Sequence, residues 1–172
     1  MEGATQAADH RPLQILLIED SDTDAHLVEL AVRKHMQGAQ LSRVSTLAEG
    51  KSVLEEQDVD ALLLDLNLPD SAGPEDTYAQ FREWMNGRPV IIMTGLQDRR
   101  LARRMVCEGA ADFLNKDIIF ANPKIIHNAI DFSIERHAAT RKLAAEKEQA
   151  QKDSKEKDNL LSCFMGGYSV NR

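Results

Sequence analysis

The chain has 172 residues, 42% of them hydrophobic, which is enough for one full core with some chain left over. Its formal net charge of −7 argues against nucleic-acid binding through bulk positive charge, and no apolar stretch approaches the ~18 residues of a membrane span. Cys107 and Cys163 have no metal-binding or redox spacing, and no secretory signal is visible, so we expect a cytoplasmic protein.

Two kinds of apolar pattern alternate along most of the chain. Apolar runs and one alternating stretch predict strands at 13–18, 39–45, 60–64, 89–93 and 111–115. Apolar stripes at helical spacing predict helices at 23–36, 47–57, 75–85 and 98–109, and Asn122-Pro123 opens a final helix. This order predicts an α/β fold whose right-handed crossovers build a parallel sheet with helices on both faces.

Composition divides the chain into three parts. Residues 1–11 are predicted to form a disordered tail, residues 12–137 a folded domain, and residues 138–172 a charged helical extension with a flexible end. Within the extension, RKLAAEKEQAQKDSKEKD (141–158) has high helix propensity but lacks a sustained a/d seam of apolar residues. This stretch fits a solvated helix, a weak dimer helix or a signalling linker.

Polar side chains follow four of the predicted strands. Glu19 and Asp20 come after the first strand, Asp65 after the third, Thr94 after the fourth and Lys116 after the fifth. Taken singly, each residue fits an ordinary loop or turn. In a parallel doubly wound sheet, however, all strands end at one edge, where ligands bind at the point of strand-order reversal. We therefore expect the five side chains to converge.

Three of these residues bring carboxylates into one crevice. Carboxylates at such short distances from one another raise one another's pKa, and their repulsion destabilises the fold. A bound divalent cation removes this repulsion. Oxygen ligands select a hard cation, and Mg²⁺ is the usual one where phosphate is handled. A carboxylate beside Mg²⁺ can attack a phosphoryl group, while a lysine and a hydroxyl hold its other oxygens. The pattern thus predicts a magnesium-dependent phosphoryl-transfer site.

The stretches ILLIEDSD, LLLDLNLPD, MTG and FLNKD resemble the motifs of the receiver domain of two-component response regulators. The likeness covers about residues 12–137. Asp65 lies 45 residues after Asp20 (65 − 20), and Lys116 lies 22 after Thr94 (116 − 94), both close to the usual offsets of that family. The resemblance implies a flavodoxin-like, five-stranded sheet of order 2-1-3-4-5, here with an extended C-terminal helix.

The resemblance also implies a role for each site residue. Asp65 is the expected phosphoacceptor, with Thr94 and Lys116 acting on the phosphoryl group. Thr94 and Phe113 are the expected switch residues, which move together after phosphorylation. The expected ligands of Mg²⁺ are Glu19, Asp20, Asp65 and the backbone carbonyl of Asn67.

One position departs from the family pattern. Receiver domains usually have proline after the lysine, often with a cis bond, whereas this chain has Asp117. Proline therefore cannot fix the shape of the loop that we expect after Lys116. The neighbouring acid is also a second candidate partner for the Lys116 ammonium.

The resemblance predicts a phosphoprotein of a two-component phosphorelay, which receives its phosphoryl group on Asp65 from a histidine kinase or a histidine phosphotransfer protein. We expect it to signal by protein–protein interaction or by homodimerisation through the last helix, without a DNA-binding domain of its own. We expect no enzymatic activity beyond self-phosphotransfer and autodephosphorylation.

Other readings stay open at this point. The chain could be a receiver fragment of a larger protein whose diguanylate cyclase, kinase or other output is missing. It could also be an aspartyl-phosphate phosphohydrolase, although such enzymes usually place a second acid where this chain has Asn67. A flavodoxin-like cofactor binder is disfavoured, because no phosphate-cradling loop follows the strand at 13–18.

Overall fold

The computed structural model describes residues 11–85, 87–95 and 99–166. Its elements in chain order are β1 (Gln14–Ile18), α1 (Asp22–His35), β2 (Gln40–Val44), α2 (Leu47–Glu56), β3 (Ala61–Asp65), α3 (Pro74–Arg82), β4 (Val90–Thr94), α4 (Arg99–Cys107), β5 (Asp112–Asn115), α5 (Lys116–Ala121) and α6 (Lys124–Gly166). All neighbouring strands pair in parallel, in the order β2-β1-β3-β4-β5. The predicted fold and strand order are therefore confirmed.

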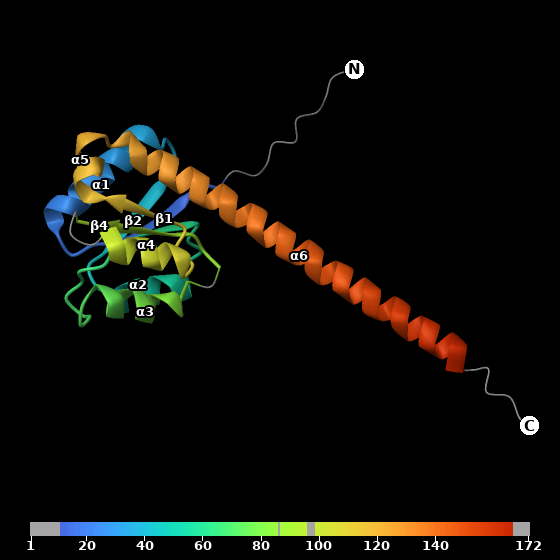
Figure 1. The fold of residues 1–172 in the computed structure, drawn as a ribbon. Helices are drawn as coiled ribbons and strands as arrows, with labels where there is room; N and C mark the ends of the chain where they lie inside the picture. Colours follow the sequence, from blue (N-terminus) through green and yellow to red (C-terminus); the bar gives the residue numbers. More distant parts are fainter. Residues whose placement is uncertain (1–10, 86, 96–98, 167–172) are drawn as a thin grey trace, which may run out of the picture. The chain divides into compact units, whose positions relative to one another are not determined.

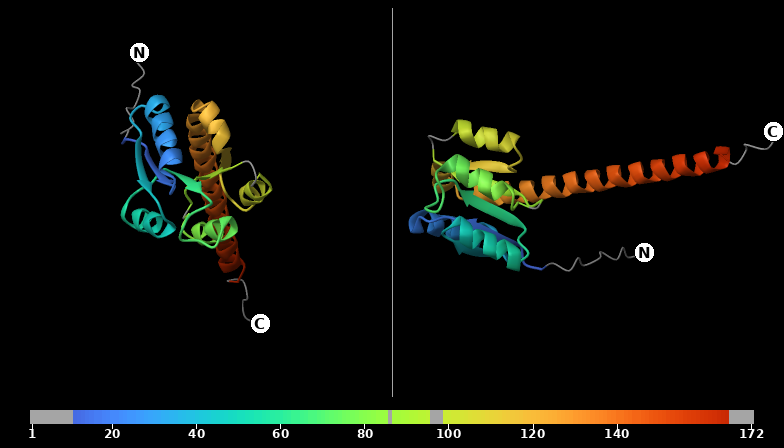
Figure 2. Two further views of the ribbon diagram at one scale, coloured as in Figure 1. Left: turned by 90° about the vertical axis from the view of Figure 1, so that its left-hand side faces the viewer. Right: turned by 90° about the horizontal axis from the view of Figure 1, so that it is seen from below.

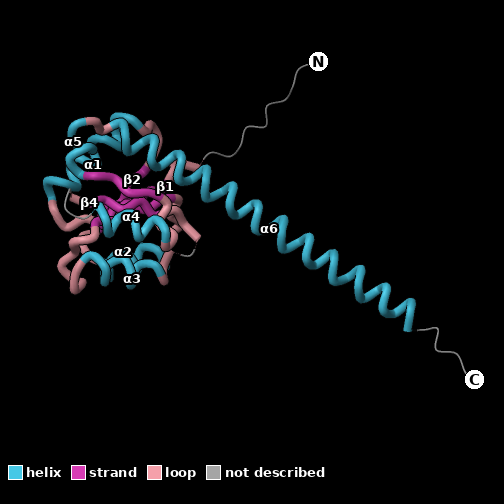
Figure 3. Tube along the Cα trace, in the orientation of Figure 1, coloured by secondary structure: helices cyan, strands magenta, loops and turns pink. Residues whose placement is uncertain are grey.

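Helices cover both faces of the sheet (Figures 1 and 3). On one face, alternate residues of the central strands pack against α1, α5 and the first turns of α6. On the other face, the intervening strand residues pack against α2, α3 and α4. The turned views in Figure 2 show the same layers. Because the central strands β1, β3 and β4 are buried on both faces, their sequences are continuous apolar runs rather than alternating ones.

Side-chain caps fix where the helices near the sheet edge begin. The Ser21 hydroxyl accepts a hydrogen bond from the backbone N–H of Asp24 at 3.3 Å, which starts α1 directly after β1. At the start of α2, the Asp70 carboxylate accepts hydrogen bonds from the N–H groups of Leu47 and Ala48, each at 3.0 Å. The loop that follows β3 is thereby tied to α2.

Most predicted boundaries differ from the observed ones by one or more residues, and two of these differences concern the site and the core. The third strand runs one residue further than predicted and includes Asp65 as its last residue. The third helix ends at Arg82 rather than at residue 85, because the chain turns there. Trp84 and Met85 lie in this turn and still pack against the core, so their apolar spacing had indicated a longer helix.

A short helix, α5, replaces the predicted loop after Lys116. The Asn115 side-chain oxygen accepts hydrogen bonds from the N–H groups of Asp117 and Ile118, at 2.8 and 3.4 Å. This cap starts the helix at Lys116 itself. The chain therefore fixes the geometry after the lysine by a capped helix, where the usual family sequence has proline.

The chain divides into two compact units, Met1–Glu135 and Arg136–Arg172, and α6 spans the boundary between them. The first unit contains the whole sheet. The predicted domain limits at residues 11/12 and 137/138 stay predictions, and residues 1–10 and 167–172 lie outside the described residues. None of the helices in the described ranges combines the length and the apolar content needed to cross a bilayer.

Candidate functional site

Three carboxylates meet at the carboxyl ends of β1 and β3. Glu19 and Asp20 follow β1 and Asp65 ends β3, and one oxygen from each lies within 4.8 Å of the others. Glu19 and Asp65 are buried, whereas Asp20 is exposed. Because β1 pairs with β3 in parallel, the two strand ends lie at the same edge of the sheet. The structure therefore brings these three acids together, as expected.

Lys116 brings a positive charge to the same cluster from the start of α5. Its ammonium lies 2.8 Å from Glu19 Oε2 and 3.1 Å from Asp65 Oδ2. A third carboxylate, that of Asp24 in α1, accepts a hydrogen bond from the ammonium at 2.9 Å. In the described part of the chain the ammonium pairs with these three acids and not with Asp117, so the second candidate partner named above is ruled out.

The charges in this cluster shift one another's protonation. Burial raises the pKa of Glu19 to about 7, against the opposing effect of its bond to Lys116. Burial alone would lower the pKa of Lys116, but Asp65, Glu19 and Asp24 outweigh it and hold this pKa above its ordinary value. The lysine is therefore charged at neutral pH, while a proton competes with any cation for Glu19.

The cluster fits a hard divalent cation. Its three acids offer carboxylate oxygens, and Mg²⁺ prefers oxygen ligands. Asp65 Oδ1 is buried and has no hydrogen-bond partner within the described ranges. A buried acceptor of this kind is costly unless a cation or another donor satisfies it. Glu19, Asp20 and Asp65 are thus the residues that could hold such an ion.

Two polar residues outside the cluster fix the loops that carry it. Arg43 of β2 donates to the backbone oxygens of Glu19 and Asp20, at 3.1 and 3.2 Å, and so holds the loop after β1. Thr77 of α3 donates to the backbone oxygen of Leu66 at 2.7 Å and so holds the residue after Asp65. Both backbone segments are therefore anchored to neighbouring elements.

Comparison with known proteins agrees with this geometry. The family model for the response regulator receiver domain matches residues 15–131. The chain belongs to the response regulator receiver domain family. Receiver domains are signalling domains of two-component systems, and they interact with a histidine kinase or a phosphotransfer protein.

Curated relatives and solved structures extend the comparison. Escherichia coli (strain K12) transcriptional regulatory protein GlrR is 28% identical over 130 residues, which are 75% of this chain but 28% of that protein. Caulobacter vibrioides cell cycle transcriptional regulator CtrA is 30% identical over 104 residues, which are 60% of this chain and 44% of that protein. The receiver domain described here therefore spans less than half the length of either relative.

Among solved structures, the signal receiver domain of a Vibrio parahaemolyticus protein described as a Luxo repressor superposes with a TM-score of 0.64 at 26% identity, covering 77% of this chain and 97% of that one. A response regulator receiver domain protein from Clostridium thermocellum gives a TM-score of 0.63 at 23% identity, covering 74% and 98% of the two chains. At that identity the second likeness shows the shared fold alone.

The remaining predicted residues lie around the edge of the receiver site. Thr94 ends β4 and is buried, and its hydroxyl donates to the backbone oxygen of Gly95 at 3.2 Å. Asn67 is exposed in the loop two residues after Asp65. Phe113 of β5 is partly buried and packs against the core on the side of α2, α3 and α4. The roles predicted for these three residues stay predictions.

Sequence reasoning missed two residues of this site. In the sequence, Asp24 is an acid in the first turn of a helix, a common position for one, and Arg43 lies in a strand with no motif of its own. The local pattern carries no signal for either contact, because each depends on how α1 or β2 packs beside the strand ends.

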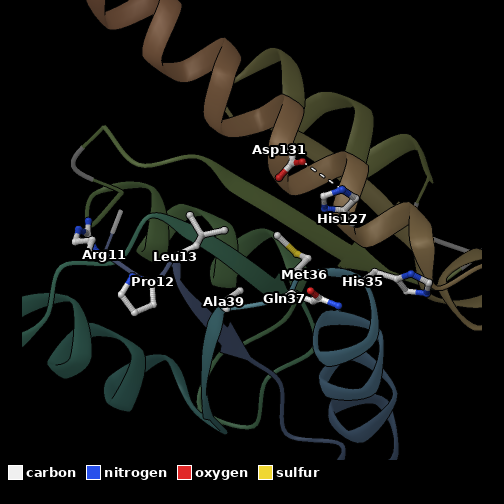
Figure 4. Close-up of a pocket in the computed structure, with 10 residues that line it drawn as sticks. Arg11, Pro12, Leu13, His35, Met36, Gln37, Ala39, His127 and Asp131 are labelled. Carbon is white, nitrogen blue, oxygen red and sulfur yellow. Dashed lines mark ion pairs between the residues drawn. The ribbon is translucent and has the colours of Figure 1, made fainter. Parts of the chain in front are cut away.

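A separate hollow of about 370 Å³ lies away from this cluster, against the N-terminal ends of β1 and β2. Figure 4 shows Met36, Leu13 and Ala39 at its floor, and His127 above them with its ion pair to Asp131 at 3.4 Å. None of the predicted site residues lines it. The parallel strands place this hollow at the sheet edge opposite the carboxylates.

Proposed function

We propose that Asp65 accepts a phosphoryl group from a histidine kinase or a histidine phosphotransfer protein. One observation carries the proposal: the Asp65 carboxylate is buried among acids, with Oδ2 paired to Lys116 at 3.1 Å and Oδ1 open. A carboxylate that is held in place by one oxygen and open at the other is suited to attack. Family membership supports the same role.

The transfer step forms one bond to phosphorus and breaks another. A carboxylate oxygen of Asp65 forms a bond to phosphorus as the bond from phosphorus to the donor's histidine nitrogen breaks, and the nitrogen keeps the electron pair. Lys116 pairs with a phosphoryl oxygen in place of the Asp65 oxygen that it contacts now. The hydroxyl of Thr94 hydrogen-bonds another phosphoryl oxygen, and Phe113 moves with Thr94.

Mg²⁺ is part of the proposal, because the three acids fit its chemistry. Glu19, Asp20 and Asp65 would hold it, together with the backbone carbonyl of Asn67. When bound, Mg²⁺ neutralises negative charge on the transferring oxygens. Water later hydrolyses the acyl phosphate on Asp65. Both reactions, transfer and hydrolysis, therefore take place at the Asp65 side chain.

The output of the domain belongs to the same proposal. We expect phosphorylation to change a protein–protein contact or to promote a homodimer through α6. The expectation that no DNA-binding domain or nucleic acid takes part stays a prediction, since both curated relatives are named as transcriptional regulators. The alternative of a larger protein with a cyclase or kinase output also stays a prediction, and so does the cytoplasmic location.

Intact-protein mass spectrometry after incubation with acetyl phosphate tests the central step. We expect the wild type to gain one phosphoryl group when MgCl₂ is present and none with excess chelator. The Asp65→Asn variant should gain none. Asp58→Asn, which removes an exposed carboxylate outside the site, is the matched control and should be labelled like the wild type.

Two results would contradict the proposal. Labelling that persists in Asp65→Asn would place the phosphoacceptor elsewhere. Release of phosphate from a generic phosphate ester, far beyond one equivalent per chain, would favour the phosphohydrolase alternative instead.

A further inference from the structure

Asp24 differs from the other two acids that contact Lys116. Glu19 and Asp65 belong to the carboxylate cluster that could hold a metal, and Asp24 does not. Its oxygen nevertheless accepts a hydrogen bond from the ammonium at 2.9 Å, as close as the other two contacts. Lys116 therefore has one carboxylate partner that no cation would take from it.

Occupation of the metal site changes what surrounds Lys116. A divalent cation held by Glu19 and Asp65 engages two of the three carboxylates that now balance the lysine charge. It also brings two positive charges close to the ammonium, in a partly buried setting where charges interact strongly. Without another partner, the long flexible side chain would either hold on to Glu19 and Asp65 or swing out of the site.

We propose that Asp24 is a positioning residue, which keeps the Lys116 ammonium beside Asp65 while a cation and a phosphoryl group occupy the other carboxylates. This inference rests on the proposed function of Asp65. An ammonium has three N–H donors, so one can stay on Asp24 while the others turn to phosphoryl oxygens. Asp24 touches neither the phosphoryl group nor the metal in this arrangement and acts only through Lys116.

Both ends of the Asp24–Lys116 contact are fixed by local structure. Asp24 lies in the first turn of α1, where its N–H is held by the Ser21 hydroxyl. Lys116 begins α5, which Asn115 caps. The two side chains are 25% and 15% exposed, so water screens their attraction less than it screens a surface pair. The contact can therefore persist while the neighbouring carboxylates change partners.

The test compares Asp24→Asn with Asp22→Asn. Both changes remove one carboxylate from the first turn of α1, but Asp22 is 94% exposed and pairs with Arg43 rather than with Lys116. The first readout is Mg²⁺ affinity of the unphosphorylated protein, from calorimetric titration with MgCl₂. The second is the rate of labelling by acetyl phosphate at saturating Mg²⁺.

We expect Asp24→Asn to weaken Mg²⁺ binding and to slow labelling, each by about fivefold, the range of a partly screened ion pair. Asp22→Asn should change either quantity by less than about twofold. Asp24→Glu, which keeps the carboxylate, should recover part of the loss. In a Lys116→Ala background, Asp24→Asn should have little further effect, because Asp24 acts through the lysine.

Three results would overturn the inference. The first is that Asp24→Asn matches Asp22→Asn in both readouts. The second is that the effects of Asp24→Asn persist undiminished in the Lys116→Ala background. The third is that Asp24→Asn is labelled faster than the wild type, which would mean that Asp24 competes with the phosphoryl group for Lys116. Failure of the proposed function looks different: the wild type would not be labelled at all. The Mg²⁺ titrations would then still decide whether Asp24 positions Lys116.

Discussion

Glu19 binds a cation in its charged form, although its side chain is buried. It is fully buried, and its pKa is raised to about 7 from an ordinary value of 4.5. The pKa of Lys116 is shifted upward and out of this range, so the lysine stays charged throughout. The proton on Glu19 therefore titrates near neutrality in the metal-free cluster.

The raised pKa of Glu19 predicts a pH-dependent stability without metal. Between pH 4.5 and about 7 the folded chain holds a proton that the unfolded chain has lost. A rise in pH across this window therefore lowers the free energy of unfolding through Glu19. This destabilisation by Glu19 is absent below about pH 4.5 and complete above about pH 7.

Glu19→Gln removes this titration. We expect the unfolding free energy of the variant, relative to the wild type, to rise by on the order of 2–3 kcal/mol from about pH 4.5 to about pH 8, because the pKa shift is lost. Urea unfolding of both proteins with excess chelator measures the difference. A difference that stays constant over this range would mean that Glu19 has an ordinary pKa.

At the scale of elements, α2 sits close to the strand that leads into the site. Gly50 of α2 faces Ile18, the last residue of β1, and a methyl group placed on Gly50 would lie 2.5 Å from Ile18 Cδ1. Phe81 of α3 lies behind it, at 3.8 Å. A glycine inside a helix costs about 1 kcal/mol of helix propensity relative to alanine. Close packing of α2 on β1 explains why residue 50 is glycine in spite of this cost.

Gly50→Ala should therefore destabilise the domain in spite of its better helix propensity. We expect a loss of about 1–2 kcal/mol, since the new methyl group overpacks a fully buried contact. Ile18→Val removes Cδ1, so the double variant should recover part of the loss caused by Gly50→Ala. Urea unfolding measures all three proteins.

Ser52→Ala is the control for propensity in the same helix, because Ser52 is exposed and bonds only to the helix backbone. It should be neutral or slightly stabilising. If Gly50→Ala behaved in the same way, α2 would have room to move away from β1.

At the scale of the whole molecule, residues 136–157 of α6 offer little apolar surface. Among the residues from 136 to 160 whose side-chain exposure is described, the large apolar side chains that are exposed are those of Leu143 and Leu160, at 67% and 60%. A stable protein interface buries at least about 1,000 Å², far more than two leucines supply. Leu143 and Leu160 are therefore too few to hold a dimer by themselves, and we expect a dimer to use the receiver unit as well.

We accordingly expect the mass in solution to depend on the state of Asp65. Light scattering with Mg²⁺ should give a monomer, and addition of beryllofluoride, a mimic of the phosphoryl group, should double the mass. Leu143→Glu should prevent the doubling, whereas Ala144→Glu, the same change of charge one position further along the helix, should permit it. A dimer in both states would make assembly independent of phosphorylation, and a monomer in both would leave partner proteins as the output.

Much of the site could be predicted from the sequence because of one property of parallel sheets. In such a sheet every strand ends at the same edge. Once the runs 13–18, 60–64 and 111–115 were taken as strands, we could therefore expect the acids after the first two and the lysine after the third to come together. The apolar runs themselves follow from burial on both faces of the sheet. The meeting of Glu19, Asp20 and Asp65 needed no knowledge of the helices, whereas the strand order was implied by the resemblance to receiver domains.

The tertiary structure decided what depends on helix packing and on turns. Asp24 reaches Lys116 only because α1 and α5 lie beside each other, and Arg43 reaches the loop after β1 only because β2 is its neighbour. The helix at Lys116 depends on the Asn115 cap, which replaces the shape that proline usually gives. Sequence periodicity determines which face of an element is buried, but the polar contacts across elements are set by the distances and angles at which those faces pack.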